Sequence, residues 1–354
     1  MSRYLSGRYA DLVPYVPGEQ PRDRAYIKLN TNESPYPPSE AAQAAGREAL
    51  ARLALYPDPT MKALREAFAA TVGVPAECVL PTNGSDEILN FAFCAFCDKD
   101  TPAVFADITY GFYSVFADLY GIPRRVIPLR EDLSVDPAAY YRAGGTIFLA
   151  NPNAPTGIAL PLSDIERILK ENPDNVVVVD EAYVDFGAES AVSLTARYDN
   201  LLVAQTFSKS RSMAGARLGF GIASPALIRD LDAIKYSTNP YNINSVTAAL
   251  GIGTLADPAY TQDNCARIAA TRTRTMAALA ALGFSMTPSV TNFIFARHPR
   301  ISGEALYDAL RARGILVRHF STPRIAEYNR ITVGSESEME SFISAVTAIL
   351  EELA

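Results

Sequence analysis

Residues 201–210 read LLVAQTFSKS, and residues 176–183 read VVVVDEAY. Each is an apolar run that closes on reactive side chains, Lys209 after the first and Asp180 with Tyr183 after the second. Short apolar runs of this kind predict buried strands of a parallel sheet. Ligands bind such sheets beyond the carboxyl ends of the strands. We therefore expect the Lys209 amine, the Asp180 carboxylate and the Tyr183 phenol to meet at one edge of the sheet.

Arg217 follows Lys209 closely and adds a cation to this set. Pyridoxal 5'-phosphate (PLP) needs these groups: an amine bonds its aldehyde carbon, a carboxylate keeps its ring nitrogen protonated, a phenol meets its ring oxygen and an arginine takes its phosphate. Separately, Lys209 could be a surface lysine and Asp180 an N-cap at a strand-to-helix turn. The next lysines along the chain are Lys170 and Lys235. The combined set predicts a PLP site.

A glycine turn, Gly84-Ser85-Asp86, lies between a predicted strand and a predicted helix. Its backbone N–H groups would point at an anion at the helix N-terminus. Alone, such a turn would favour an ordinary helix cap. Together with Thr206, Ser208 and Arg217, it predicts the cup for the cofactor phosphate.

Two further segments follow predicted strands. Tyr110 could lie flat on a planar cofactor or be a core aromatic residue. Residues 151–157 read NPNAPTG, which is either a proline-rich turn or a constrained cofactor contact. We assign Tyr110 and Asn153 to the cofactor site.

The composition of the 354 residues favours a globular enzyme, with 49% hydrophobic and 20% charged residues. A net charge of −7 argues against a nucleic-acid partner. There is no apolar run long enough to span a membrane, and residues 1–4 (MSRY) contain no apolar signal region, so we expect a cytoplasmic protein. The chain has four cysteines and two histidines, which gives little support for a disulfide framework or a metal site, and we predict no metal.

The order of apolar runs predicts an α/β fold with three parts. Residues 1–38 form an extended N-terminal arm that packs on the small domain and the active site, with a strand at 27–29. Residues 39–240 form a large domain, a three-layer, mostly parallel sheet with helices on both faces. Residues 241–354 form a smaller α+β domain. The strands expected in the two domains cover residues 78–81, 103–106, 125–129, 146–150, 176–180, 201–206, 218–222, 292–296, 315–318 and 330–333.

Helix starts are predicted from capping patterns. Helices are expected to begin near Ser39 and after Thr60. Capping boxes are expected at Ser163 with Glu166 and at Ser335 with Glu338.

With these motifs, the chain resembles the fold-type-I PLP-dependent aminotransferases and, within them, the histidinol-phosphate aminotransferases. The resemblance runs from the arm to the last helix. Besides the motifs above, it rests on residues 12–18, 29–36, 56–59, 314–318 and 330–334.

The resemblance implies further roles. Tyr56 would reach across a homodimer interface to the PLP phosphate of the partner subunit. Arg330 would bind the anionic group of the substrate, and Arg318, Tyr15 and Asn32 would help to bind it. From the sequence alone, surface salt bridges are the favoured interpretation of Arg318 and Arg330.

One position departs from the family pattern. The family usually has asparagine where this chain has Ala154, and that asparagine bonds the PLP ring oxygen. Either Asn153 substitutes for it after a local shift, or Tyr183 holds the oxygen alone.

The resemblance implies PLP-dependent transamination of L-histidinol phosphate with 2-oxoglutarate, in histidine biosynthesis. The open alternatives are an aromatic amino acid aminotransferase, a PLP-dependent threonine-phosphate decarboxylase, and a PLP-fold binding or regulatory domain without turnover. A dinucleotide-binding oxidoreductase fits poorly, because no G-x-G-x-x-G motif follows the first strand.

Overall fold

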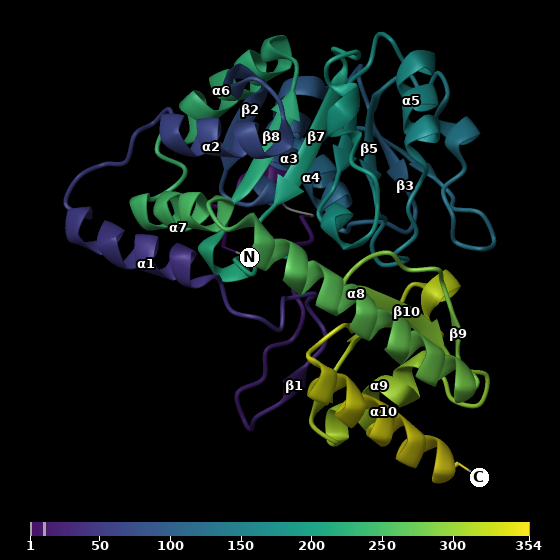
Figure 1. The fold of residues 1–354 in the computed structure, drawn as a ribbon. Helices are drawn as coiled ribbons and strands as arrows, with labels where there is room; N and C mark the ends of the chain where they lie inside the picture. The colour runs from purple at the N-terminus through teal and green to yellow at the C-terminus, as the bar shows by residue number, and fades with distance from the viewer. Residues whose placement is uncertain (1, 10–11, 354) are drawn as a thin grey trace.

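The structure is a computed structural model, and it describes residues 2–9 and 12–353. Residues 1, 10–11 and 354, which include the start of the predicted arm and the last position of the small domain, lie outside the described residues. Figure 1 shows a large α/β part above a smaller part that holds the C-terminus. The long helix α8, Pro258–Ala281, runs from one part to the other. The boundaries predicted at residues 38 and 240 stay predictions.

The centre of the large part is a sheet whose described strands run in the order β2-β8-β7-β6-β5-β3-β4. Strands β3 to β7 pair in parallel, whereas β8 is antiparallel to both of its neighbours. The mostly parallel sheet is therefore confirmed. The strands are β2 (Val79–Thr82), β3 (Ala103–Ala106), β4 (Arg124–Ile127), β5 (Thr146–Ala150), β6 (Val177–Asp180), β7 (Leu201–Thr206) and β8 (Gly219–Ala223).

Both faces of this sheet are covered, because alternate strand side chains enter different cores. Val177 and Val179 of β6 pack in a core with α2 and α5, whereas Val178 packs in a core with α3, α4 and α6. All strands of the sheet except the edge strand β4 are fully buried. The helices of this part are α1 (Glu40–Ala49), α2 (Lys62–Val72), α3 (Ser85–Phe96), α4 (Phe112–Tyr120), α5 (Leu162–Glu171), α6 (Pro225–Thr238) and α7 (Ser245–Leu255).

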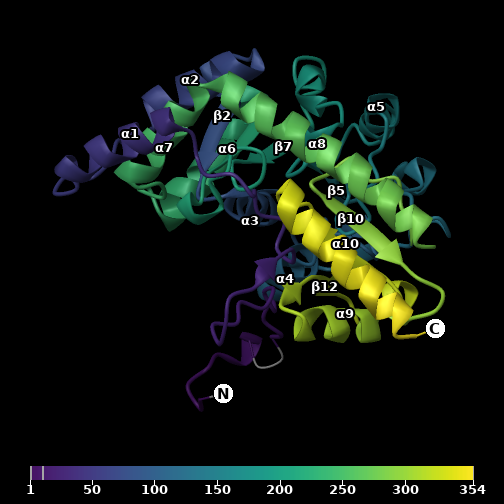
Figure 2. The same ribbon diagram turned by 60° about the horizontal axis from the view of Figure 1, so that its bottom comes forward.

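The smaller part contains a sheet of order β12-β13-β10-β9, packed against α8, α9 and α10 around a separate core. Figure 2 shows α10 lying along β10 and α8. The predicted strand at 315–318 is in fact split, because β11 pairs with β1 of the arm while β12 joins the four-stranded sheet. The elements are β1 (Ile27–Lys28), β9 (Ser285–Met286), β10 (Phe293–Arg297), α9 (Gly303–Ala312), β11 (Ile315–Leu316), β12 (Arg318–His319), β13 (Asn329–Thr332) and α10 (Glu336–Glu351).

Two of the four predicted helix caps are confirmed. Ser39 accepts a hydrogen bond from the Ala42 N–H, and Ser335 forms a complete capping box with Glu338 at α10.

The helix expected after Thr60 is confirmed, because α2 begins at Lys62, but Thr60 as its N-cap and the capping box at Ser163 are wrong. The N-cap position of α2 is Met61, and Asp58 rather than Thr60 accepts the Lys62 N–H. The cap of α5 is Pro161, so Ser163 already lies inside the helix, and Glu166 instead pairs with Lys170 and Arg197.

Within residues 2–9 and 12–353, no helix has the length and apolar character that a membrane crossing requires.

Candidate active site

Three neighbouring strands, β5, β6 and β7, end at the same edge of the large sheet, where Ala150 pairs with Asp180 and Asp180 with Ala204. A cavity of about 380 Å³ lies at this edge. The structure therefore brings together most of the predicted cofactor residues. Those lining the cavity are Ser85, Asp86, Tyr110, Asp180, Tyr183, Thr206, Ser208, Lys209 and Arg217.

Lys209 follows β7 and lies deep in this cavity. Its Nζ donates to the Thr31 carbonyl at 3.2 Å and lies 5.9 Å from the centroid of the Tyr183 ring. Burial, with the nearby positive charge of Arg330, lowers the pKa of Lys209 to about 8. A neutral amine is the nucleophilic form, so this environment increases the reactive fraction near neutral pH.

Asp180, the last residue of β6, is buried with 4% of its surface exposed. Its carboxylate accepts hydrogen bonds from the Tyr113 hydroxyl at 3.0 Å and the Ala182 N–H at 3.2 Å. It forms no ion pair within the described part of the chain, and burial raises its pKa to about 6. A protonated pyridine nitrogen would supply the missing cation, so Asp180 fits the ring of PLP.

Tyr183 is held from the arm. Asn32 Nδ2 donates to its hydroxyl oxygen at 2.9 Å, and its ring meets the Phe293 ring edge-on at 5.1 Å. The Asn32 N–H in turn donates to the Thr332 hydroxyl at 2.9 Å. The arm, the large sheet and the small sheet therefore meet at this phenol, and burial raises its pKa.

The residues predicted to form the phosphate cup lie where α3 begins. Gly84 has φ +77°, and a Cβ there would lie 2.6 Å from Arg217 Nη2. Arg217 pairs with Asp86 at 3.0 Å and donates to the Ser208 hydroxyl at 3.4 Å, while Thr206 donates to the same hydroxyl at 3.0 Å. A helix N-terminus, two hydroxyls and a guanidinium are a suitable donor set for a phosphate.

Tyr110 lines the same cavity beside Asp86. Its hydroxyl donates to Asp86 at 2.6 Å, and its ring meets the Tyr113 ring edge-on at 5.7 Å. Tyr113 was not predicted as a site residue, although it follows Tyr110 by three positions and directly bonds Asp180. The i, i+3 spacing of two tyrosines was the signal for it.

The assignment of Asn153 requires correction. Its amide donates to the Ile108 carbonyl at 3.0 Å and the Thr156 hydroxyl at 3.1 Å, and its oxygen accepts from Thr109 at 2.8 Å. These bonds tie the turn to the segment that follows β3, and Asn153 is not among the residues that line the cavity. Ala154 lines the cavity instead. The other alternative, in which Tyr183 holds the ring oxygen alone, stays a prediction.

A second cavity of about 560 Å³ shares Lys209, Tyr183 and Arg217 with the first. It holds all four residues that were predicted to bind the substrate, which are Tyr15, Asn32, Arg318 and Arg330. Phe320 and Thr322 also line this cavity; neither was predicted, because no local sequence pattern marks them.

Arg318 and Arg330 lie directly opposite each other on β12 and β13. Arg330 lies near the rings of Phe293 and Phe320, and it donates to the Asn30 carbonyl at 2.9 Å. Its Nε is buried and has no hydrogen-bond partner among the described residues, which also offer it no ion pair. Arg330 is thus a half-buried cation at the cavity with no anionic partner among the described residues, so the hypothesis of a surface salt bridge is wrong for this residue.

Tyr56 lies away from both cavities of its own chain. It is 81% exposed and stacks on Tyr241 with ring centroids 4.6 Å apart. Its predicted contact with a partner subunit stays a prediction.

Comparisons with known proteins agree with this geometry. Residues 24–346 match the family described as aminotransferase class I and II. The chain is 50% identical, over the full length of both proteins, to histidinol-phosphate aminotransferase of Marinomonas sp. (strain MWYL1). It is 49% identical to histidinol-phosphate aminotransferase 1 of Bradyrhizobium diazoefficiens, over 99% of this chain and all of the relative.

The solved structures share the fold. Histidinol-phosphate aminotransferase from Sinorhizobium meliloti, in complex with PLP, superposes with a TM-score of 0.86 at 24% identity, over 94% of this chain and 92% of that one. The predicted fold type is confirmed, and the donor set of the cavity fits the cofactor. The chain therefore belongs to the class I and II aminotransferases, and it is a PLP-dependent aminotransferase.

Proposed function

We propose that this enzyme transaminates L-histidinol phosphate with 2-oxoglutarate, as a step of histidine biosynthesis. The observation that carries the proposal is the facing pair Arg318 and Arg330, at a cavity that opens onto Lys209. The names of the relatives that are about half identical over their full length support the same substrate.

Bound PLP supplies an aldehyde carbon that takes up the substrate amine and a ring that accepts an electron pair. We infer that Lys209, once released from the cofactor, carries a proton to and from the substrate α-carbon. Its lowered pKa of about 8 leaves part of it neutral near physiological pH, as a general base requires. Asp180 would keep the ring nitrogen protonated, and the hydroxyl of Tyr183 would meet the ring oxygen.

We infer that the cup formed by Gly84, Ser85, Ser208 and Arg217 holds the cofactor phosphate. Arg217, which pairs with Asp86 at 3.0 Å, would share its guanidinium with that phosphate, since arginine forms strong charge-assisted hydrogen bonds to phosphate oxygens. The two anchored ends of the cofactor, phosphate and ring nitrogen, would then fix its aldehyde carbon near Lys209.

Substrate choice follows from the two arginines. A dianionic phosphate accepts from both guanidiniums better than a carboxylate does, since each charge-assisted contact contributes about 1.5–3 kcal/mol. The same pair would take a carboxylate of 2-oxoglutarate in the second half of the cycle. This accounts for one site serving two different anions.

The test is a comparison of amine donors. Single-turnover loss of the PLP absorbance should be fastest with L-histidinol phosphate. Arg318→Ala should raise the KM for that substrate by about tenfold to a hundredfold and change phenylalanine or tyrosine turnover far less. Arg313→Ala, on the surface of the same domain, is the matched control and should change neither.

Two outcomes would replace the proposal. Faster turnover of aromatic amino acids, or an equal effect of Arg318→Ala on both substrate classes, would assign the enzyme to aromatic amino acids. Release of carbon dioxide from threonine phosphate would assign it as a decarboxylase.

We further propose that the enzyme works in the cytoplasm as a homodimer, with small molecules as its other partners. The exposed apolar segment from Leu50 to Tyr56 supports the dimer, because Leu55 and Tyr56 are 72% and 81% exposed. Such side chains are typical of a surface that a second subunit covers. Tyr56 would then complete the phosphate cup of the partner.

A further inference from the structure

The segment that carries Tyr56 lies between α1 and α2, and it has no helix or strand from Leu53 to Met61 in the described structure. A side chain that is to reach a second subunit from such a loop must be held by something else. Asp58 organises the far end, because it accepts the N–H groups of Thr60 at 2.9 Å and Lys62 at 3.0 Å. These bonds lie within the loop, so they do not fix how the loop is oriented against the domain.

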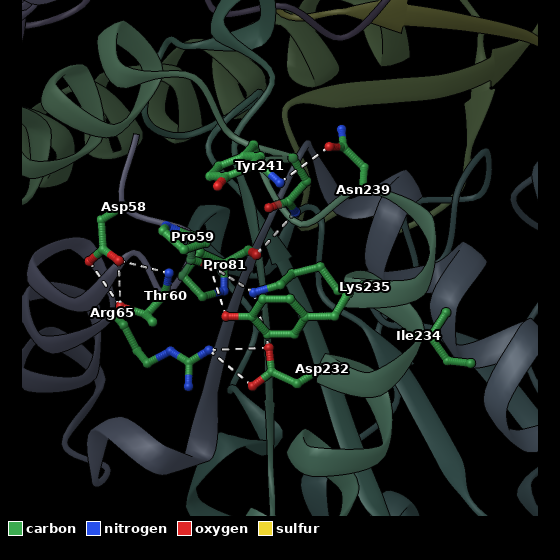
Figure 3. A network of polar contacts seen from close by, with 12 residues as sticks. Asp58, Pro59, Thr60, Arg65, Pro81, Asp232, Ile234, Lys235, Asn239 and Tyr241 are labelled. Carbon is green, nitrogen blue, oxygen red and sulfur yellow. Dashed lines mark hydrogen bonds and ion pairs between the residues drawn. The ribbon is translucent and has the colours of Figure 1, made fainter. Parts of the chain in front are cut away.

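A buried lysine supplies that orientation. Lys235 lies on α6 with 2% of its surface exposed, and its Nζ donates to the Pro59 carbonyl at 3.0 Å. Figure 3 shows this amine pointing from α6 to the Pro59 carbonyl. The Tyr236 ring lies 4.2 Å from the amine, and its hydroxyl lies 3.5 Å from the same carbonyl.

Lys235 also pairs with a carboxylate in the same network. Asp232, one turn earlier on α6, lies 3.2 Å from Lys235 Nζ and 3.3 Å from Arg65 Nη2 of α2. A buried ammonium is costly unless its donors and its charge are matched, and here the matching groups are one carboxylate and one loop carbonyl. Displacing Pro59 would therefore leave a buried donor unsatisfied, so Lys235 fixes the position of Pro59.

The other side of the loop is held from the segment that follows α6. The Tyr56 ring stacks on Tyr241 at 4.6 Å with 24° between the planes. The Tyr241 N–H donates to Asn239 at 3.2 Å, and the Asn239 N–H donates back to the Lys235 carbonyl at 2.8 Å. Pro59 is therefore held directly by Lys235, and Tyr56 is held through Tyr241 and Asn239, which bond back to Lys235. Figure 3 shows Lys235, Asn239 and Tyr241 in this arrangement.

We propose that Lys235 is a positioning residue that acts on the active site of the partner subunit: it holds the Pro59 carbonyl so that Tyr56 meets the partner's cofactor phosphate. This inference rests on the proposed homodimer. It assigns Lys235, which lies outside both cavities of its own chain, an effect across the interface and none within its own site.

The test uses mixed dimers with one working site, made with two different affinity tags. In the first hybrid, one chain carries Lys209→Ala and Lys235→Met, and the other chain is wild type. The working site then receives Tyr56 from the altered loop. In the second hybrid, Lys235→Met is placed on the chain that keeps Lys209, so its site receives Tyr56 from an unaltered loop. Both hybrids contain the same two substitutions.

The readout is the dissociation constant of PLP, measured from the absorbance of the bound cofactor. We expect it to rise about tenfold in the first hybrid, the effect of one misplaced phosphate contact, and to stay near that of a hybrid without Lys235→Met in the second. Lys62→Met, an exposed lysine of α2, should leave it unchanged in either position. An equal rise in both hybrids, or a rise only in the second, overturns the inference.

Two further measurements keep the result decisive. If Lys235→Met chains do not assemble, the same pair of hybrids is built with Lys235→Gln, and the same inequality is expected. Sedimentation of the wild-type enzyme is measured first. A wild-type monomer would refute the proposed dimer itself, whereas a dimer with equal hybrids would refute only the role of Lys235.

Discussion

Replacing Asp180 by asparagine should stabilise the protein without PLP while removing its catalysis. Asp180 is buried, and its pKa is raised from 3.8 to about 6, chiefly by burial. The folded state therefore disfavours the ionised form of this carboxyl. An asparagine side chain would have nearly the same shape and no charge, and it could still accept the hydrogen bond from Tyr113.

The magnitude follows from the shift. About two pKa units at roughly 1.4 kcal/mol each amount to about 3 kcal/mol of lost stability above pH 6. An asparagine amide is a poorer acceptor for the Ala182 N–H than the carboxylate is, and losing that hydrogen bond costs about 1 kcal/mol. Asp180→Asn should therefore raise the free energy of unfolding of the PLP-free protein by about 2 kcal/mol at pH 7.5.

The sign depends on pH in a defined way. Between pH 3.8 and about 6 the folded state binds more protons at Asp180 than the unfolded state does, so the contribution of this residue to stability falls as the pH rises. Near pH 4 most of the free-energy cost of burying the ionised Asp180 carboxylate is absent. The gain from the substitution should shrink there to zero or reverse, because only the lost hydrogen bond remains.

The assay is urea unfolding of the PLP-free wild type and variant at fixed protein concentration, at pH 7.5 and pH 4. Asp230→Asn, an exposed substitution on α6, is the matched control. Transamination by the PLP-loaded variant should fall by about three orders of magnitude, since an amide does not hold the ring nitrogen charged. The reasoning would be refuted by a variant that is less stable than wild type at pH 7.5, or by a stability difference that does not change with pH.

Two further substitutions test the site itself. Lys209→Ala should abolish transamination, and borohydride reduction of the wild type should fix the cofactor to Lys209; a label on another lysine contradicts the assignment. Gly84→Ala should weaken PLP binding by at least about tenfold, because φ is +77° and the new Cβ would lie 2.6 Å from Arg217 Nη2. Gly73→Ala, at φ +74° with open space around it, should cost about 1–2 kcal/mol of stability yet leave PLP affinity unchanged; equal loss of affinity in both would assign the Gly84 effect to backbone strain alone.

Local pattern was sufficient for the strands of the large sheet. The runs that end at Asp180 and Thr206 are apolar up to their polar last positions, so their burial on both faces and their parallel pairing could be predicted. The reactive residues close or follow these runs directly, and that places them at one edge without any knowledge of the rest of the chain.

Helix caps were predicted less well. The pattern Ser163-x-x-Glu166 satisfies the rule for a capping box, but the helix starts earlier, at Leu162, because Pro161 can precede it and Glu166 has basic partners nearby. A cap depends on where the chain enters the helix, and the neighbouring elements decide that.

The sequence by itself therefore determined the α/β class, the strand ends that carry Lys209 and Asp180, and the need for a PLP-like group. The tertiary structure alone decided that Arg318 and Arg330 face each other, and that the Asn153 side chain bonds Ile108 and Thr109 of another segment. The physical reason is that a side chain's direction depends on strand register and on hydrogen-bond partners from distant segments. Those partners are set by packing, which no local window of sequence contains.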